Sequence, residues 1–190
     1  MKKTSFKLVV LIALTVAYSC KTPQNIKKVT GAVEISVPFS ENKYKSDNDF
    51  FRAKNSGKSV DLATAKKVAI MNAKSELAGA IQSIMKAVTD QYTNSRTVGH
   101  NEEFENKFEQ LARDVVNETL SDVRIMDEKI FKETDSKYTY WVAIETSKQS
   151  VLEGMNNKIS NNQKLQLDYD KMKFEKVFNS EMEKLAKQQN

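Results

Sequence analysis

Cysteine and histidine are nearly absent from this chain, and their absence removes several kinds of chemistry. The 190 residues include one cysteine, Cys20, and one histidine, His100. A lone cysteine has no disulfide partner within the chain, so packing must hold the fold together. A nucleophile–histidine–acid triad would have to use His100, which lies in a polar stretch, and the sequence contains no nucleophile elbow. Catalysis by such a triad is therefore not indicated.

Glycine and proline are scarce as well, with five and two residues. So few turn-forming residues indicate short or polar loops and a fold dominated by helix. The hydrophobic fraction of 39% and the charged fraction of 29% are ordinary for a globular protein, which argues against a disordered or multi-span chain. The length predicts one domain with appendages.

The N-terminus has the three parts of a secretory signal. Residues 1–7 carry three lysines, residues 8–16 are apolar and uncharged, and small residues then precede Cys20 in the sequence AYSC. The apolar part is too short for a permanent membrane-spanning helix. A cysteine in this place can take a diacylglycerol thioether and, once residues 1–19 are removed, an acyl chain on its new amine. The arrangement resembles a bacterial lipoprotein signal and predicts that Cys20 is lipidated.

Lipidation at Cys20 would fix the mature protein to a membrane, because two or more acyl chains give durable attachment. The alternative is a plain signal peptide followed by an incidental cysteine. Residues 20–32 are polar and short of large apolar groups, as expected for a tether between lipid and domain. They lack the acidic run of some surface lipoproteins, which favours an outer-membrane protein that faces the periplasm.

The charge balance argues against nucleic acid as a partner. Removing residues 1–19 takes away three lysines and no acid, so the formal net charge falls from +5 to about +2. This balance and the export signal favour the membrane, through acyl chains on Cys20, and envelope proteins or cell-wall components as partners.

Periodicity along the mature chain predicts alternating strands and helices. Residues 33–39 alternate apolar and polar side chains, so they predict a strand that Pro38 ends or places at an edge. Residues 49–59 predict a second, weaker strand closed by a turn at 55–57. From residue 61 to 88, apolar residues recur at three- and four-residue steps and predict an amphipathic helix, with Ser59 or Asp61 as its cap.

The second half of the domain predicts one more helix and a hairpin. Residues 92–96 suggest a short strand, and the spacing of apolar residues from 104 to 120 predicts a helix. Residues 121–131 and 138–146 predict two strands of a β-hairpin. The aromatic cluster around Trp141, in the second of these strands, predicts core packing with one half-exposed ring.

Residues 150–190 predict a helical tail after a domain that spans residues 33–149. Ser150 to Glu153 has the spacing of a capping box, and SNNQ at 160–163 predicts a break between two helices. The apolar stripe of this tail either packs back on the domain or presents a face to a partner. The candidate partner surface consists of Trp141, Phe178, Met182 and Leu185.

Two fragments of known binding motifs are incomplete, so no cofactor or metal site is predicted. GKS at 57–59 lacks the second glycine of a phosphate-binding loop, because Arg52 stands five residues before Gly57. We therefore expect Gly57 to supply a turn conformation. DND at 47–49 lacks the glycine and the acid of a calcium loop, because Arg52 and Lys58 occupy the sixth and twelfth positions.

The order of these elements resembles the Lpp-twenty family of small envelope lipoproteins and the N-terminal domain of the flagellar assembly protein T. The likeness spans roughly residues 49–148, about half the chain. It is carried by Gly57, Ala65, Ala69, Ala73, Leu77, Ala78, Val123, Tyr140 and Val142. The resemblance implies an α+β fold with helices on one face of a small antiparallel sheet, exported and lipid-anchored, and it supplies no catalytic residues.

Three functions remain open at this point. The first is a non-catalytic binding or assembly module of the outer membrane. The second is a structural protein that self-associates as a homo-oligomer through residues 150–190. The third is a hydrolase of envelope polymers, for which no carboxylate pair can be singled out from the sequence.

Overall fold

The computed structural model describes residues 35–95, 102–167 and 169–189. The chain divides into two compact units, Met1–Ile35 and Ser36–Asn190, and every element below belongs to the second. Cys20, His100 and the expected tether lie outside the described residues. Among the helices that are described, none is both long and apolar enough to span a bilayer.

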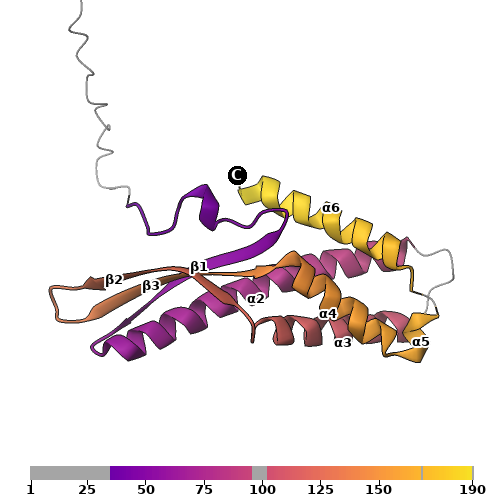
Figure 1. Cartoon of the computed structure of the whole chain (residues 1–190), viewed down its shortest axis with the longest axis horizontal. Coiled ribbons are helices and arrows are strands. Elements are labelled where there is room, and N and C mark those ends of the chain that lie inside the picture. Colours follow the sequence, from indigo (N-terminus) through magenta and orange to yellow (C-terminus); the bar gives the residue numbers. More distant parts are fainter. Residues whose placement is uncertain (1–34, 96–101, 168, 190) are drawn as a thin grey trace, which may run out of the picture. The chain divides into compact units, whose positions relative to one another are not determined.

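Three antiparallel strands form a sheet in the order β1-β3-β2 (Figure 1). The strands are β1 (Phe50–Ser59), β2 (Arg124–Lys132) and β3 (Tyr138–Ser147). The strand predicted over residues 49–59 and the hairpin are thereby confirmed. Because β3 lies in the middle, both of its faces are covered: Val142 is buried in the main core, and Ala143 is buried on the opposite face, called here the outer face.

Helix α2 (Leu62–Asn94) runs along one face of the sheet, as Figure 1 shows. The side chain of Asp61 caps it by accepting a hydrogen bond from the backbone N–H of Thr64 at 2.7 Å. Of the predicted alanine-rich stripe, Ala65, Ala69, Ala73, Leu77 and Val88 are fully buried, Ile84 is 7% exposed and Ala80 is partly buried. The helix continues through Tyr92, where a strand was expected, because Tyr92 is buried and stacks on Phe108 with ring centroids 5.6 Å apart. The short strand predicted over residues 92–96 is therefore wrong for the described residues 92–95.

Gly57 lies where β1 contacts α2, and the turn predicted there is wrong. It lies inside β1, paired with Tyr140 of β3. A Cβ atom at this position would stand 2.4 Å from the carbonyl oxygen of Ala65 and 2.5 Å from the backbone nitrogen of Ala69. Only glycine lets the helix backbone approach the strand this closely.

The remaining helices enclose the second half of α2. They are α3 (Glu102–Thr119), α4 (Lys148–Ser160), α5 (Gln163–Gln166) and α6 (Lys171–Gln189). The break predicted at residues 160–163 is confirmed. Helix α4 begins earlier than predicted, because Ser147 rather than Ser150 is its cap and accepts a hydrogen bond from the Ser150 N–H at 3.0 Å. Together with the sheet these helices confirm the α+β fold class.

Residues 36–49 cross the outer face of the sheet, and we call this segment the strap. The strand predicted over residues 33–39 is wrong for the described residues 35–39, which form no ladder. Phe39 instead has a positive φ of 63°, which turns the chain back toward the sheet. The rings of Phe39 and Tyr44 are buried against Ala143 and Trp141, and Tyr44 ends the short helix η1 (Asn42–Tyr44). The strap therefore closes the outer face with its own small core.

Candidate functional site

The four residues predicted as a partner surface do not form one. Phe178 and Met182 are fully buried in the main core, where α6 packs back on the domain, so they cannot face a partner. Phe178 meets Phe51 of β1 edge to face, with ring centroids 6.4 Å apart. Leu185 packs against the same core, and Trp141 is half-buried beside the strap on the outer face.

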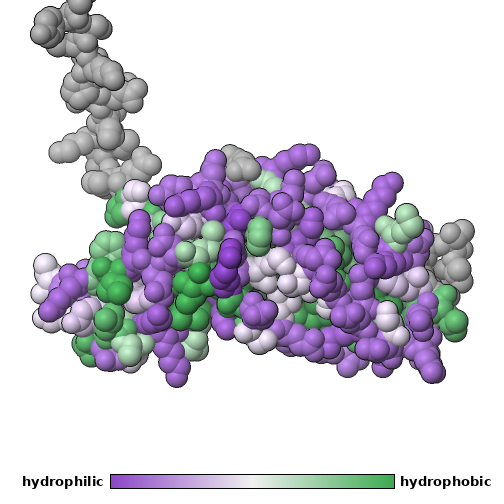
Figure 2. All heavy atoms as spheres, in the orientation of Figure 1, coloured by the Kyte–Doolittle hydropathy of each residue, from purple (hydrophilic) through white to green (hydrophobic). Residues whose placement is uncertain are grey.

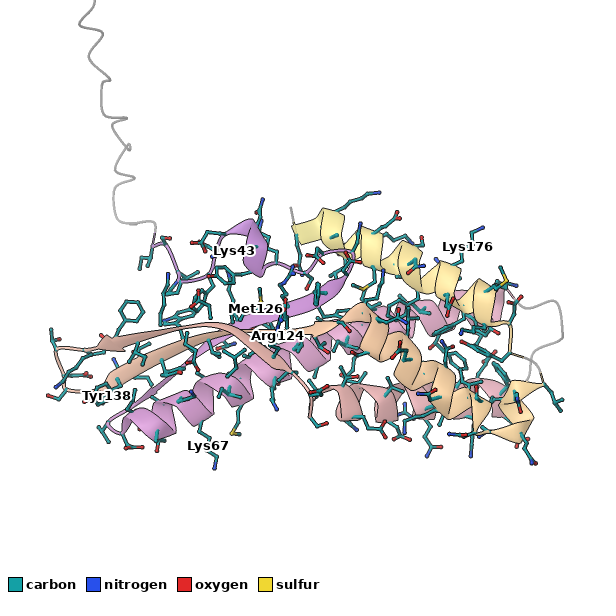
Figure 3. The ribbon with its side chains drawn as sticks, viewed as in Figure 1. Lys43, Lys67, Arg124, Met126, Tyr138 and Lys176 are labelled. Atoms are coloured by element: carbon teal, nitrogen blue, oxygen red, sulfur yellow. The ribbon has the colours of Figure 1, made fainter. Side chains whose placement is uncertain are left out.

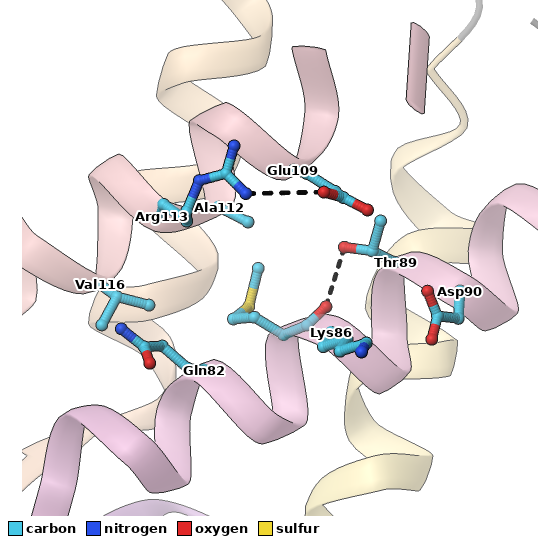
Figure 4. A pocket seen from close by; sticks show the side chains of 9 residues that line it. Gln82, Lys86, Thr89, Asp90, Glu109, Ala112, Arg113 and Val116 are labelled. Atoms are coloured by element: carbon cyan, nitrogen blue, oxygen red, sulfur yellow. Dashed lines mark hydrogen bonds and ion pairs between the residues drawn. The ribbon is translucent and has the colours of Figure 1, made fainter. Parts of the chain in front are cut away.

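A groove lies between α2 and α3. It holds about 360 Å³, which is within the usual size range of small-ligand sites. Figure 4 shows its lining side chains, which come from two turns of each helix. They are Gln82, Met85, Lys86, Thr89 and Asp90 of α2, with Glu109, Ala112, Arg113 and Val116 of α3.

The floor of the groove is apolar and its rim is charged. Met85, Ala112 and Val116 are buried at the floor. Thr89 is buried too, and its hydroxyl donates a hydrogen bond to the carbonyl oxygen of Met85 at 2.8 Å. The small side chain of Ala112 leaves the space that a larger residue would fill. The floor can therefore take up an apolar group without breaking a hydrogen bond.

The rim presents cations and anions on both helices. Lys86 and Asp90 are one helical turn apart on α2, about 6 Å along its axis. Glu109 and Arg113 have the same spacing on α3 and form an exposed ion pair, with 3.5 Å between Arg113 Nη1 and Glu109 Oε2. Figure 4 shows Asp90 and Glu109 toward one end of the groove and Arg113 toward the other. Such a rim suits a ligand that carries polar groups around an apolar centre.

A second polar cluster lies on the outer face and centres on Glu145, which is 3% exposed. Arg52 Nε donates to Glu145 Oε2 at 2.9 Å, and Arg124 Nε donates to Glu145 Oε1 at 3.0 Å. Arg52 also binds Asp47 of the strap. Burial raises the pKa of Asp47, but hydrogen bonds from the Asp49 N–H, Arg52 and the Phe50 N–H outweigh it, so this pKa lies below its ordinary value.

The pairing of Glu145 makes it a structural acid. A hydrolase would need a carboxylate that is free to exchange a proton with substrate or water, whereas both oxygens of Glu145 are held by guanidinium groups. Within residues 35–95, 102–167 and 169–189, no group of three or more His, Cys, Asp or Glu is placed to hold a metal ion. His100 lies outside these residues.

Sequence reasoning missed the groove, although part of its signal was visible. The i, i+4 spacing of Glu109 and Arg113 and the small Ala112 on the apolar side of α3 can be read from the sequence. The placement of α3 against α2 is a tertiary feature, because α3 also contacts α4 and α5. No protein-family model matches the chain, and no curated protein shows a significant sequence match to it.

Proposed function

We propose that this chain is an outer-membrane lipoprotein, anchored by acyl chains on Cys20, whose unit Ser36–Asn190 is a non-catalytic binding module facing the periplasm. The organisation is similar to that of the Lpp-twenty envelope lipoproteins, on the residues given above. The signal-like residues 1–19 and the cysteine that follows them support the anchor. The partner is an envelope protein or a cell-wall component.

The observation that carries the binding role is the groove between α2 and α3. It combines a buried apolar floor with a rim of both charge signs. Such a site can hold a ligand or a partner side chain reversibly. The self-association alternative draws no support from Phe178 and Met182, because these residues are used inside the fold.

The anchor is tested by Cys20→Ser. We expect the wild-type protein in the membrane fraction and the variant in the soluble fraction, because the serine cannot receive the thioether-linked lipid. Cell fractionation with immunoblotting measures this shift, and mass spectrometry of the wild-type protein should find an acylated N-terminal cysteine at position 20. Unchanged membrane partition of the variant, or an uncleaved leader on the wild type, would contradict the proposal.

The groove is tested by filling it. A photo-crosslinking residue at Gln82, on the rim, should capture a specific partner in intact cells. The additional change Ala112→Leu should reduce this adduct about tenfold or more, because the larger side chain occupies the floor. The matched control is Ala63→Leu, at an exposed site in the first turn of α2, which should leave the adduct unchanged.

Two outcomes would overturn the groove as the binding site. One is an adduct of equal yield in the Ala112→Leu protein, with its thermal unfolding midpoint preserved. The other is the same adduct from a crosslinker at Lys176, which lies on the exposed side of α6 and outside the groove.

A further inference from the structure

We propose that the strap and the outer face of the sheet dock on the anionic lipid surface that holds the anchor. This inference rests on the proposed function, because it concerns the lipidated protein. It adds an orientation: one defined face of the folded unit lies against the lipid head groups, and the groove between α2 and α3 is left accessible.

The register of the strands places a row of cations on the outer face. In antiparallel pairs, residues opposite one another point to the same side of the sheet. Ala143, which is buried under the strap, lies opposite Lys54 and Asp127, and Trp141 lies opposite Ser56 and Lys129. The cations that share this face by the same register are Arg52, Lys54, Lys58, Arg124 and Lys129.

The strand acids of this face are engaged inside the protein, whereas Glu41 and Asp49 of the strap are exposed. Glu145 binds Arg52 and Arg124, as described above. Asp127 accepts a hydrogen bond from the Tyr44 hydroxyl, and this bond lowers the pKa of Asp127 below its ordinary value. Both carboxylates are therefore bound to groups within the fold, and they are less available to repel an anionic surface.

Two lysines on this side of the molecule lie beside aromatic rings. Within the described part of the chain, neither Lys43 of the strap nor Lys129 of β2 forms an ion pair with a carboxylate, and both are exposed. Their ammonium groups lie over the rings of Tyr44 and Phe39, at 4.6 Å and 5.2 Å from the ring centroids. Cations held beside aromatic rings in this way can meet lipid phosphates without giving up a salt bridge.

Exposed apolar side chains accompany these cations. Val37 of the strap is 43% exposed, and Phe131, on the outer face at the tip of the hairpin, is 45% exposed. In the view of Figure 2, hydrophobic side chains gather over the end of the sheet near the hairpin, on a surface that is otherwise largely hydrophilic. Apolar groups set among lysines are typical of surfaces that lie in the head-group region of a bilayer.

Helix α3, on the other side of the molecule, has the opposite charge character. Helix α3, which packs on α2 away from the strap, carries only two basic residues, Lys107 and Arg113. Its acids are Glu102, Glu103, Glu105, Glu109, Asp114 and Glu118. Figure 3 shows Lys43 on the strap and Lys67 on α2 directed to opposite sides of the sheet. An anionic surface would therefore attract the strap side and repel α3.

Covalent connection keeps the basic side near the membrane. The strap begins at Ser36, and residues 20–35 join it to the lipidated cysteine. A chain of this length spans at most roughly 55 Å, so the outer face stays within reach of the head groups. Tethering raises the effective concentration of lipid, and a modest attraction is then enough to orient the domain.

The orientation is tested on the lipidated full-length protein in vesicles. Cys20 is the single cysteine of the chain and its sulfur is acylated in the proposed lipoprotein, so one introduced cysteine can be labelled alone. Ser40→Cys places a fluorophore on the strap, and Ser75→Cys places it on the exposed side of α2; both serines are exposed. Nitroxide-labelled lipid then quenches a fluorophore that lies close to the bilayer.

In vesicles of phosphatidylglycerol and phosphatidylcholine, we expect strong quenching at position 40 and little at position 75. In phosphatidylcholine alone, or in high salt, quenching at position 40 should fall about fivefold, because the attraction is electrostatic. Equal quenching at the two positions, or the same quenching at position 40 in both lipids, would overturn the docking.

Charge reversal gives a second test. Lys43→Glu with Lys129→Glu should reduce the quenching at position 40 about fivefold or more, and Lys43→Glu alone should reduce it in part. The matched control is Lys67→Glu with Lys74→Glu on α2, which changes the net charge equally and should retain the quenching. In every case the protein should sediment with the vesicles. Loss of sedimentation would contradict the anchor, whereas loss of the difference between the two pairs would contradict only the docking.

Discussion

Replacing Gly57 with alanine is expected to lower the free energy of unfolding by about 3 kcal/mol or more. The added methyl group would meet the carbonyl oxygen of Ala65 at 2.4 Å and the backbone nitrogen of Ala69 at 2.5 Å. Both are backbone atoms of α2, which a rotamer change cannot move. Strand and helix must separate, and the fully buried alanine stripe at this contact would lose its packing.

Chemical denaturation of the full chain measures this loss, and thermal unfolding should show a midpoint lower by roughly 10 °C. The matched control is Gly79→Ala in α2, where an added Cβ meets nothing within 4 Å. That change should raise stability by about 0.5–1 kcal/mol, because alanine has the higher helix propensity. Similar unfolding midpoints for the two variants would show that β1 and α2 are not in the close contact described here.

Replacing Glu145 with glutamine should lower the free energy of unfolding by about 3 kcal/mol. The side chain of Arg52 is 12% exposed and that of Glu145 is 3% exposed, so the variant would leave a guanidinium group in a poorly hydrated place without its main counter-charge. Asp47 would remain beside Arg52 and would offset part of the loss. The strap should loosen as well, because Arg52 also donates a hydrogen bond to the carbonyl oxygen of Lys45 at 2.8 Å.

Urea denaturation measures the stability loss, and hydrogen exchange of the strap amides measures the loosening. Arg124→Gln is the matched control, because Arg124 binds the same carboxylate from a side chain that is 75% exposed. Arg124→Gln should lower the free energy of unfolding by about 1 kcal/mol or less. Equal costs for the two variants would mean that burial does not set the strength of this network.

Local patterns predicted the elements whose side chains repeat at a fixed period. The steps Ala65, Ala69, Ala73 and Leu77 predicted the buried side of α2, and all four are fully buried. Alternation over residues 138–146 predicted β3 with its two faces. These predictions succeed because helix and strand periodicities follow from backbone geometry alone.

Tertiary contacts decided the features that were predicted wrongly. Gly57 was expected in a turn, but it is the close approach of α2 to β1 that requires a residue without a side chain. This approach is visible only in the folded chain. Residues 35–39 alternate like a strand, yet the outer face offers them a side-chain core instead of a ladder. The stripe through Phe178 could have faced a partner, and only packing against Phe51 shows that it is internal.

The end of α6 meets the strap, since the Ser46 N–H donates a hydrogen bond to Gln189 Oε1 at 2.7 Å. The last turn of α6 therefore lies beside the strap. A fluorescent protein or affinity tag fused beyond α6 would emerge next to the strap, and in the proposed docking it would compete for the same space as the bilayer. Reporters intended to leave the protein's attachment undisturbed belong elsewhere on its surface.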